Sequence, residues 1–322
     1  MKILVPRSLD LRFGTAGSLD LIDYDPAEPL PPEHPDAEIL VTWDNTSANL
    51  ADAAGKLPRL RLVQALATGV EKMLAAPFLP DVRMASGHSL QNDTVSEHAL
   101  ALALALVRDL PGLARAQHRA QWSDELRLAQ IDEQRPPRRT LHDANVVIWG
   151  FGGIGRTLAR LFEALGSNVF GVARSARDVD GFAVSAVSDL PGLLPKADVL
   201  VMILPDLPEN RRALSAERLS LLREGAWVVN VGRGATIDEA ALLQALDSSR
   251  VAGAALDVFE TEPLPSESPL WSHPNVIVTP HVAGGRLRGA AQLIAANVAR
   301  LADGRPLINE ISRPASTSKQ LA

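Results

Sequence analysis

From Asn145 onward, largely apolar runs of four to six residues recur six times, with helix-sized gaps between them. The runs occupy residues 146–149, 169–172, 199–204, 227–231, 253–256 and 276–279. Short continuous runs of this kind predict strands buried on both faces, and such strands belong to a parallel sheet covered by helices. The rhythm therefore predicts a doubly wound α/β domain, in which helices cross over between neighbouring strands.

The rest of the chain shows a less regular alternation. We predict strands at residues 2–5, 38–41 and 60–65, and an exposed loop at 23–36, which contains five prolines. A long helix is expected over 97–121, capped by Ser96 or Thr94, and an amphipathic helix over 287–303. The segment Arg-Pro-Pro-Arg-Arg at 135–139 is interpreted as a solvated linker, with anion binding as the alternative.

Length and composition limit the class of protein. A chain of 322 residues suggests about two domains, and 46% hydrophobic with 22% charged residues is typical of a folded globular protein. The net charge of −6 disfavours nucleic acid and polybasic membrane binding. The absence of cysteine excludes disulfides and thiolate catalysis. No apolar run is long enough for a signal peptide or membrane span, so we expect a cytoplasmic protein without nucleic-acid or membrane partners.

A glycine-rich loop follows the first of the six apolar runs. Residues 150–155 read Gly-Phe-Gly-Gly-Ile-Gly, which matches the pattern G-x-G-x-x-G between a strand and a helix. In that context Gly150 permits the turn, Gly152 lets the backbone approach a pyrophosphate, and Gly155 lets the helix pack on the strand. With Gly153 and Ile154, these residues form a predicted dinucleotide-binding loop, whose helix N-terminus faces the phosphates. A structural glycine turn is the alternative.

The end of the second run indicates which dinucleotide is bound. A carboxylate there would bind the adenosine ribose and repel a 2′-phosphate, but Ala173 occupies that position. Arg174, Ser175 and Arg177 follow it, and guanidinium groups suit a phosphate. The sequence therefore favours NADP(H), with NAD(H) possible if these arginines only solvate a loop.

Three further polar segments each follow a predicted strand. They contain Arg233, Glu262 and His281, in Asn-Val-Gly-Arg-Gly, Asp-Val-Phe-Glu-Thr-Glu-Pro-Leu and Thr-Pro-His-Val-Ala-Gly. The carboxyl ends of parallel strands form the ligand-binding edge of a sheet, so a cation, a carboxylate and an imidazole can converge there on a small anion. Taken singly, Arg233 could cap a helix, Glu262 could be a loop charge, and His281 could be a core histidine.

In order and spacing, these segments and the glycine loop resemble the D-isomer-specific 2-hydroxyacid dehydrogenases, in particular the glyoxylate/hydroxypyruvate reductase branch. The resemblance is specific over about residues 93–284 and looser before that. It implies that Arg233 clamps the substrate carboxylate, that His281 is the general acid and base, and that Glu262 hydrogen-bonds His281. It also implies substrate contacts from Thr68 and Gly69, and cofactor contacts from Val95, Leu204, Pro205, Val231 and Asp257.

The chain departs from the family pattern at two places. Glu71 stands where an aspartate is usual after the substrate-loop glycine, and Ser86-Gly87-His88-Ser89 replaces an asparagine-containing turn. Substrate preference can therefore differ from that of relatives.

The resemblance implies a Rossmann nucleotide domain, residues 95–282, inserted into a smaller flavodoxin-like α/β substrate domain made of 1–94 and 283–322. It implies NADPH-dependent reduction of a small 2-keto acid to the D-2-hydroxy acid, without a metal, in a homodimer formed through the helix at 99–107. The alternatives are an NAD-dependent dehydrogenase of another D-2-hydroxy acid, including phosphoglycerate, and a dinucleotide-sensing corepressor or scaffold on the same fold.

Overall fold

The chain folds into two compact units, each with its own parallel sheet. The computed structural model describes residues 1–9, 11, 19–131, 137–285 and 287–312. The first unit combines residues 1–91 with 286–322, and the second unit is the continuous segment Asn92–Gly285 between them. The predicted domain boundaries follow residues 94 and 282. The boundaries between the two compact units follow Gln91 and Gly285.

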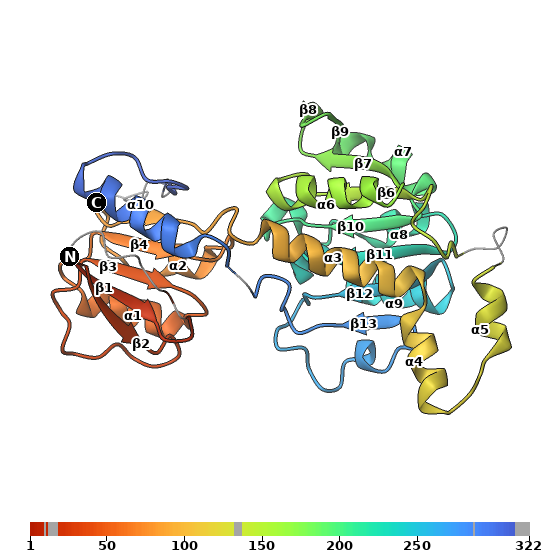
Figure 1. Ribbon diagram of the computed structural model, residues 1–322, viewed down its shortest axis with the longest axis horizontal. Helices are drawn as coiled ribbons and strands as arrows, with labels where there is room; N and C mark the ends of the chain where they lie inside the picture. Colours follow the sequence, from red (N-terminus) through yellow and green to blue (C-terminus); the bar gives the residue numbers. More distant parts are fainter. Residues whose placement is uncertain (10, 12–18, 132–136, 286, 313–322) are drawn as a thin grey trace, which may run out of the picture. The chain divides into compact units, whose positions relative to one another are not determined.

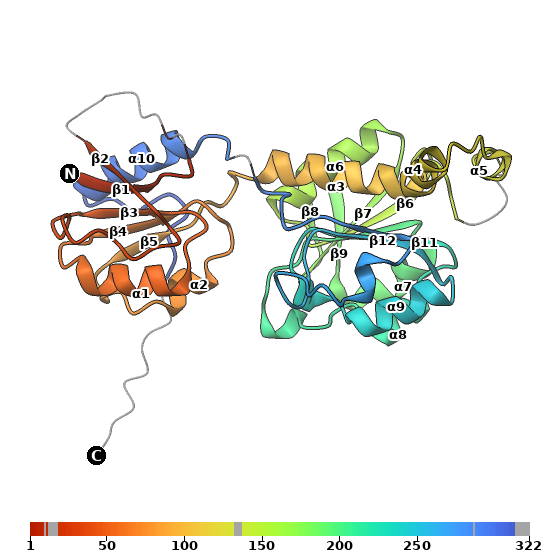
Figure 2. The same cartoon turned by 90° about the horizontal axis from the view of Figure 1, so that it is seen from below.

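The first unit is a five-stranded parallel sheet in the order β2-β1-β3-β4-β5. Its strands are β1 (Lys2–Pro6), β2 (Asp20–Tyr24), β3 (Ile39–Thr42), β4 (Leu62–Ala65) and β5 (Arg83–Ala85). Helices α1 (Ser47–Lys56) and α2 (Glu71–Ala75) cover one face, and α10 (Ala290–Ala302) covers the other (Figure 2). This strand order is the flavodoxin-like one.

Alternation along the strands gives this sheet two apolar cores. Ile3 and Val5 pack with α10, whereas Leu4 packs with α1. A buried hydrogen bond of 2.6 Å from the Asn297 amide nitrogen to Gln64 Oε1 ties α10 to β4. Helix α10, which follows the second unit in the chain, therefore packs on the sheet that the N-terminal strands form.

The second unit is an eight-stranded sheet in the order β13-β12-β11-β10-β6-β7-β9-β8, in which only β8 pairs antiparallel. Its strands are β6 (Asn145–Trp149), β7 (Asn168–Ala173), β8 (Arg177–Val179), β9 (Phe182–Ala186), β10 (Val199–Met202), β11 (Ala226–Asn230), β12 (Val251–Leu256) and β13 (Val276–Val278). The order reverses between β6 and β10, and this switch point is where doubly wound sheets bind nucleotides. The predicted fold class is confirmed.

Helices cover both faces of the larger sheet (Figures 1 and 2). One core is formed with α3 (Asn92–Val107) and α6 (Gly153–Ala164), and the other with α7 (Leu190–Leu193), α8 (Ala216–Leu221) and α9 (Glu239–Asp247). Helices α4 (Leu110–His118) and α5 (Asp124–Ala129) follow α3 at the edge of the unit (Figure 1).

The single helix predicted over residues 97–121 is wrong. The structure has α3 and α4 instead, because the chain turns at Asp109, which takes a left-handed conformation with φ of 51°. The Asp109 carboxylate caps α4 by accepting from the Gly112 N–H, and Pro111 lies in the first turn, where a missing N–H costs nothing. The prediction missed this cap because the alanine- and leucine-rich sequence before Asp109 favours a continuous helix.

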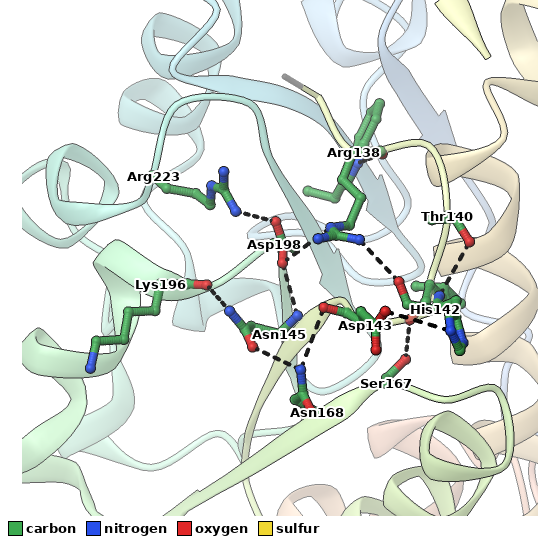
Figure 3. A network of polar contacts seen from close by, with 12 residues as sticks. Arg138, Thr140, His142, Asp143, Asn145, Ser167, Asn168, Lys196, Asp198 and Arg223 are labelled. Carbon is green, nitrogen blue, oxygen red and sulfur yellow. Dashed lines mark hydrogen bonds and ion pairs between the residues drawn. The ribbon is translucent and has the colours of Figure 1, made fainter. Parts of the chain in front are cut away.

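Of the arginine segment at 135–139, Arg135 and Pro136 lie outside the described residues. The described part, residues 137–139, packs on the second unit, so the prediction of a solvated linker is wrong there. Arg138 lies 3.5 Å from the buried carboxylate of Asp198 and donates to the His142 carbonyl (Figure 3). Asp198 also accepts from Arg223 and from the Asn145 N–H at the start of β6. The network holds the segment on the amino-terminal edge of the sheet.

Next to this network, Arg139 lies over the Trp227 ring, 5.6 Å from its centroid. Both residues line a cavity of about 300 Å³.

Four strands of the structure were not predicted, namely β2, β5, β8 and β9. The β2 strand contains Asp23, which was assigned to the exposed loop, and its mostly exposed side chains do not give the apolar run of a buried strand.

Candidate active site

The glycine loop joins β6 to α6 at the switch point of the larger sheet. A Cβ on Gly150, whose φ is +112°, would lie 2.4 Å from the Ile203 carbonyl oxygen, and one on Gly155 would lie 2.6 Å from the Gly150 oxygen. These two glycines are required by close packing. A Cβ on Gly152 would meet nothing within 4 Å, and Gly152 begins α6 without a side-chain cap. The free N–H groups of that helix end and the open space beside Gly152 fit a dinucleotide pyrophosphate.

The residues predicted to select the cofactor lie at the end of β7 and the start of β8. Arg174, Ser175 and Arg177 are all exposed. Arg177 donates a hydrogen bond of 3.3 Å to the carbonyl oxygen of Phe151 in the glycine loop. This bond holds one guanidinium group beside the loop, at the edge where an adenosine ribose would bind.

Arg233 lies in a loop after β11 that the fully buried Asn230 fixes in place. The Asn230 side chain accepts from the Gly232 N–H at 3.0 Å and donates to the Arg233 carbonyl at 3.1 Å. A Cβ on Gly234 would lie 1.8 Å from the Phe259 carbonyl carbon, so only glycine permits this loop to pack on the one that carries Glu262. Asn230 is the first residue of the sequence segment that contains Arg233, but only the structure shows that its side chain holds the loop.

His281 and Glu262 form a direct pair at the ends of β13 and β12. The His281 Nδ1 atom lies 2.7 Å from Glu262 Oε2, and both side chains are partly exposed. The second carboxylate oxygen accepts from the Phe259 N–H at 3.0 Å. Because Nδ1–H donates to Glu262, the His281 Nε2 atom is left to exchange a proton with a ligand.

Hydrogen bonds, burial and neighbouring charges shift the pKa values of both side chains. The hydrogen bond to Glu262 raises the pKa of His281 above its ordinary value, outweighing burial and the charge of Arg233, which lower it. Burial alone would raise the pKa of Glu262, but the bonds from His281 and Phe259 and the charges of His281 and Arg233 lower it overall. The carboxylate therefore stays charged and favours the imidazolium form.

Asp257 follows β12 and has a carboxylate that is only 1% exposed. Its oxygens accept from the Val282 and Ala283 N–H groups, each at 3.0 Å, in the turn that carries His281. Burial would raise the pKa of Asp257, but these and other hydrogen bonds lower it. Contact between Asp257 and the cofactor stays a prediction.

The remaining predicted residues divide between the units. In the second unit Val95, Leu204 and Val231 are buried in the cores beside the sheet, and Pro205 is exposed at the end of β10. In the first unit Thr68 is exposed after β4 and donates to Gln91 Oε1 at 3.3 Å, with Gly69 next to it. Their contacts with substrate or cofactor stay predictions.

The divergent turn Ser86–Ser89 packs directly against the Thr68 segment. The Gly87 N–H donates to the Ala67 carbonyl at 2.9 Å, and a Cβ on Gly87 would lie 2.0 Å from the Leu66 oxygen. The divergent turn and the predicted substrate loop are therefore in direct contact.

Among the described residues, no group of three or more histidine, aspartate or glutamate side chains is arranged to hold a metal ion. Within the same parts of the chain, no helix has the length and apolarity required to cross a bilayer.

The fold and the residues at its strand ends define a doubly wound protein of the nucleotide-binding class. Residues 100–283 match the sequence model of the family described as "D-isomer specific 2-hydroxyacid dehydrogenase, NAD binding domain". The chain belongs to this family of oxidoreductases.

Named relatives agree with this assignment. The chain is 31% identical to a glycerate dehydrogenase of Methylorubrum extorquens, over 80% of each chain. It is 32% identical to a glyoxylate/hydroxypyruvate reductase A of Salmonella newport, over 79% of this chain and 81% of the relative. A crystal structure of an NADPH-dependent glyoxylate/hydroxypyruvate reductase from Sinorhizobium meliloti, in complex with NADP and sulfate, superposes with a TM-score of 0.80 at 28% identity, covering 97% and 98% of the chains.

The pairing of His281 with Glu262 leads to a prediction about pH. In Glu262→Gln, the alkaline limb of kcat/KM for keto-acid reduction should move about one unit or more to lower pH. If His281 is the acid, reduction needs its imidazolium form, which is lost as the pH rises through the pKa of His281, and the hydrogen bond to the Glu262 carboxylate is what raises that pKa. For oxidation, which needs the neutral imidazole, the acid limb should move in the same direction. Initial rates across pH in both directions give the measurement.

The control for this variant is Glu260→Gln. Glu260 lies in the same loop, but its carboxylate pairs with Arg212 at 3.2 Å rather than with His281. Its profile should match that of the wild type. An unmoved limb in Glu262→Gln would contradict the role of Glu262.

Proposed function

We propose that this protein reduces a small 2-keto acid of the glyoxylate or hydroxypyruvate type to the D-2-hydroxy acid with NADPH. The observation that carries the proposal is the His281–Glu262 pair, whose charges interact with Arg233 at the carboxyl edge of a dinucleotide-type sheet. The named relatives support this substrate class, because glycerate is the product of hydroxypyruvate reduction. Oxidation of NADPH by glyoxylate and hydroxypyruvate, followed by absorbance, tests the proposal.

Bound NADPH would supply the hydride that adds to the carbonyl carbon. Arg233 would bind the substrate carboxylate through its guanidinium fork and polarise the keto oxygen. His281 would give its Nε2 proton to that oxygen, while Glu262 holds Nδ1–H and stabilises the imidazolium before the transfer. The first unit would serve as the substrate domain, with Thr68 and Gly69 as its substrate contacts.

The alternatives lead to different assay results. An NAD-dependent dehydrogenase of another D-2-hydroxy acid, including phosphoglycerate, would prefer NADH and a larger keto acid in a substrate panel. A dinucleotide-sensing corepressor or scaffold would bind the cofactor without turnover. The protonatable pair His281–Glu262 favours an enzyme, since binding alone does not need it.

The choice of NADPH rests on the exposed arginines after β7 and on the absence of a carboxylate at Ala173. The double variant Arg174→Ala/Arg177→Ala should lower kcat/KM with NADPH about 10- to 100-fold and leave the NADH value within about twofold, because only NADPH carries the 2′-phosphate that charge-assisted bonds would hold. Kinetics with both cofactors measure this. Arg160→Ala, which removes an arginine paired with Asp180 at 2.9 Å on the exposed face of α6, is the control. Equal losses with the two cofactors would reject the assignment.

We propose a homodimer formed through α4, α5 and the segment between them, because most apolar side chains of the helix expected at the interface, residues 99–107, are buried in the core of their own unit. Exposed apolar side chains gather on and beside α4 and α5: Leu110, Leu113, Trp122, Leu128 and Ile131, with Trp122 90% exposed. Apolar side chains concentrated in this way are typical of an interface. Localisation in the cytoplasm stays a prediction, which cell fractionation tests.

Sedimentation of Trp122→Glu tests the dimer. A buried charge at an interface costs several kcal/mol, so at micromolar concentration the variant should sediment as a monomer and the wild type as a dimer. Leu165→Glu, which changes a 40% exposed leucine at the end of α6, should remain dimeric. A monomeric wild type would refute the homodimer.

A further inference from the structure

His98 belongs to a chain of hydrogen bonds that ends at the buried carboxylate of Asp257. Its Nε2 atom lies 3.1 Å from Thr279 Oγ1 and 3.4 Å from Asp257 Oδ1. The Thr279 hydroxyl donates to the same Asp257 oxygen at 2.5 Å. A hydroxyl has one proton, and here it points at Asp257, so Thr279 must accept from His98. The order is therefore His98 Nε2–H to Thr279 Oγ1–H to Asp257 Oδ1.

The same aspartate holds the turn that carries His281. Its main-chain oxygen accepts from the His281 N–H at 2.9 Å, and its carboxylate accepts from the next two N–H groups. His281 itself has a left-handed backbone with φ of 53°, which is unfavourable for a side-chain-bearing residue. Such a conformation persists only where the surroundings impose it, and here Asp257 supplies the bonds that do so.

The chain of bonds also joins two distant parts of the second unit. His98 lies in α3, close to Asn92 where the unit begins, and residues 279–283 lie just before Gly285, where it ends. The segments through which the polypeptide enters and leaves this unit are thus linked by side chains around Asp257. The Asp257 carboxylate is the point where these bonds meet the turn of His281.

We infer that His98 is a positioning residue for His281, acting through Thr279 and Asp257. The inference rests on the proposed function, in which His281 transfers the proton. His98 fills the acceptor site of the Thr279 hydroxyl and so directs its proton at Asp257 Oδ1. With that oxygen engaged, the carboxylate keeps the orientation in which it binds the N–H groups of residues 282 and 283. Loss of the His98 donor frees the hydroxyl to rotate and loosens the turn.

A double-mutant cycle tests the chain of bonds. His98→Leu and Thr279→Val should each lower kcat about 10- to 100-fold, because sub-ångström displacement of a proton donor is costly. The double variant should be no slower than the slower single variant, since both changes break the same chain. The Kd of NADPH, measured by fluorescence, should stay within about threefold of the wild-type value.

Conservative replacements separate positioning from packing. His98→Gln puts an amide N–H near the place of Nε2 and should recover most of kcat, as should Thr279→Ser, which keeps the hydroxyl. His118→Leu, which removes an exposed imidazole from α4, is the control and should not affect kcat. Melting temperatures identify any variant that fails to fold. If His98→Leu is one of them, the kcat of Thr279→Val against that of Thr279→Ser tests the same chain of bonds, and equal losses in these two variants would overturn the inference.

Three outcomes would overturn the inference: full kcat in His98→Leu, additive losses in the double variant, or an equal loss in His98→Gln and His98→Leu. The proposed function is judged separately, by turnover of the wild type and its loss in His281→Ala. An active wild type that depends on His281 but not on His98 would reject the positioning role alone.

Discussion

Replacing His281 with alanine should lower kcat about 10²- to 10⁴-fold, the usual contribution of general acid–base catalysis. In the proposed mechanism the imidazole gives the proton, since Glu262 holds Nδ1–H at 2.7 Å and Nε2 would then face the substrate. The side chain is partly exposed and lies in a turn held by main-chain bonds, so its removal should not unfold the protein. Steady-state rates with glyoxylate and NADPH give the measurement.

Binding measurements show whether the loss is chemical. The Kd of NADPH should stay within a few-fold of the wild-type value, because the glycine loop and the β7 end are untouched. His142→Ala, at an exposed site on the opposite edge of the sheet, is the matched control and should retain full turnover. Near-wild-type kcat in His281→Ala would refute its role as the acid.

Replacing Arg233 with alanine should lower kcat/KM for the keto acid about 10³-fold. Two charge-assisted hydrogen bonds of about 2 kcal/mol each amount to about 4 kcal/mol, and each 1.36 kcal/mol corresponds to a factor of about ten in rate. The loop is set by Asn230, and Arg233 Nη1 donates to the Gly232 carbonyl at 2.8 Å, so the guanidinium is already oriented in the folded chain. Arg233→Lys should recover only part of the loss, since an ammonium cannot form the planar fork.

A second readout of Arg233 does not depend on substrate binding. Its charge lowers the pKa of His281, so Arg233→Ala should raise that pKa further, which an NMR titration of the imidazole can follow. Arg212→Ala, which removes a cation paired with Glu260 rather than with the active-site pair, is the control. Unchanged kcat/KM in Arg233→Ala would exclude the carboxylate clamp.

Local pattern was sufficient for six of the eight strands of the larger sheet, because each of these six is a largely continuous apolar run, which is typical of a strand with both faces buried. It was sufficient to nominate Arg233, Glu262 and His281, since each follows such a strand. The strands β2 and β8 were missed because their side chains are mostly exposed, β9 because it lacks a continuous buried run, and β5 because it has only three residues. The break between α3 and α4 was missed because the cap at Asp109 depends on one left-handed residue.

By itself the sequence determined the doubly wound class, the glycine loop and the order of the polar strand ends, because strand burial, turn chemistry and helix N-termini are local properties. Tertiary structure alone decided which groups meet. Gly234 packs on Phe259 and brings the Arg233 loop against the Glu262 loop, and Asp257 gathers the turn of His281 together with His98 from α3. These contacts join residues that are far apart in the chain. They come close together only when the strands assemble into the sheet.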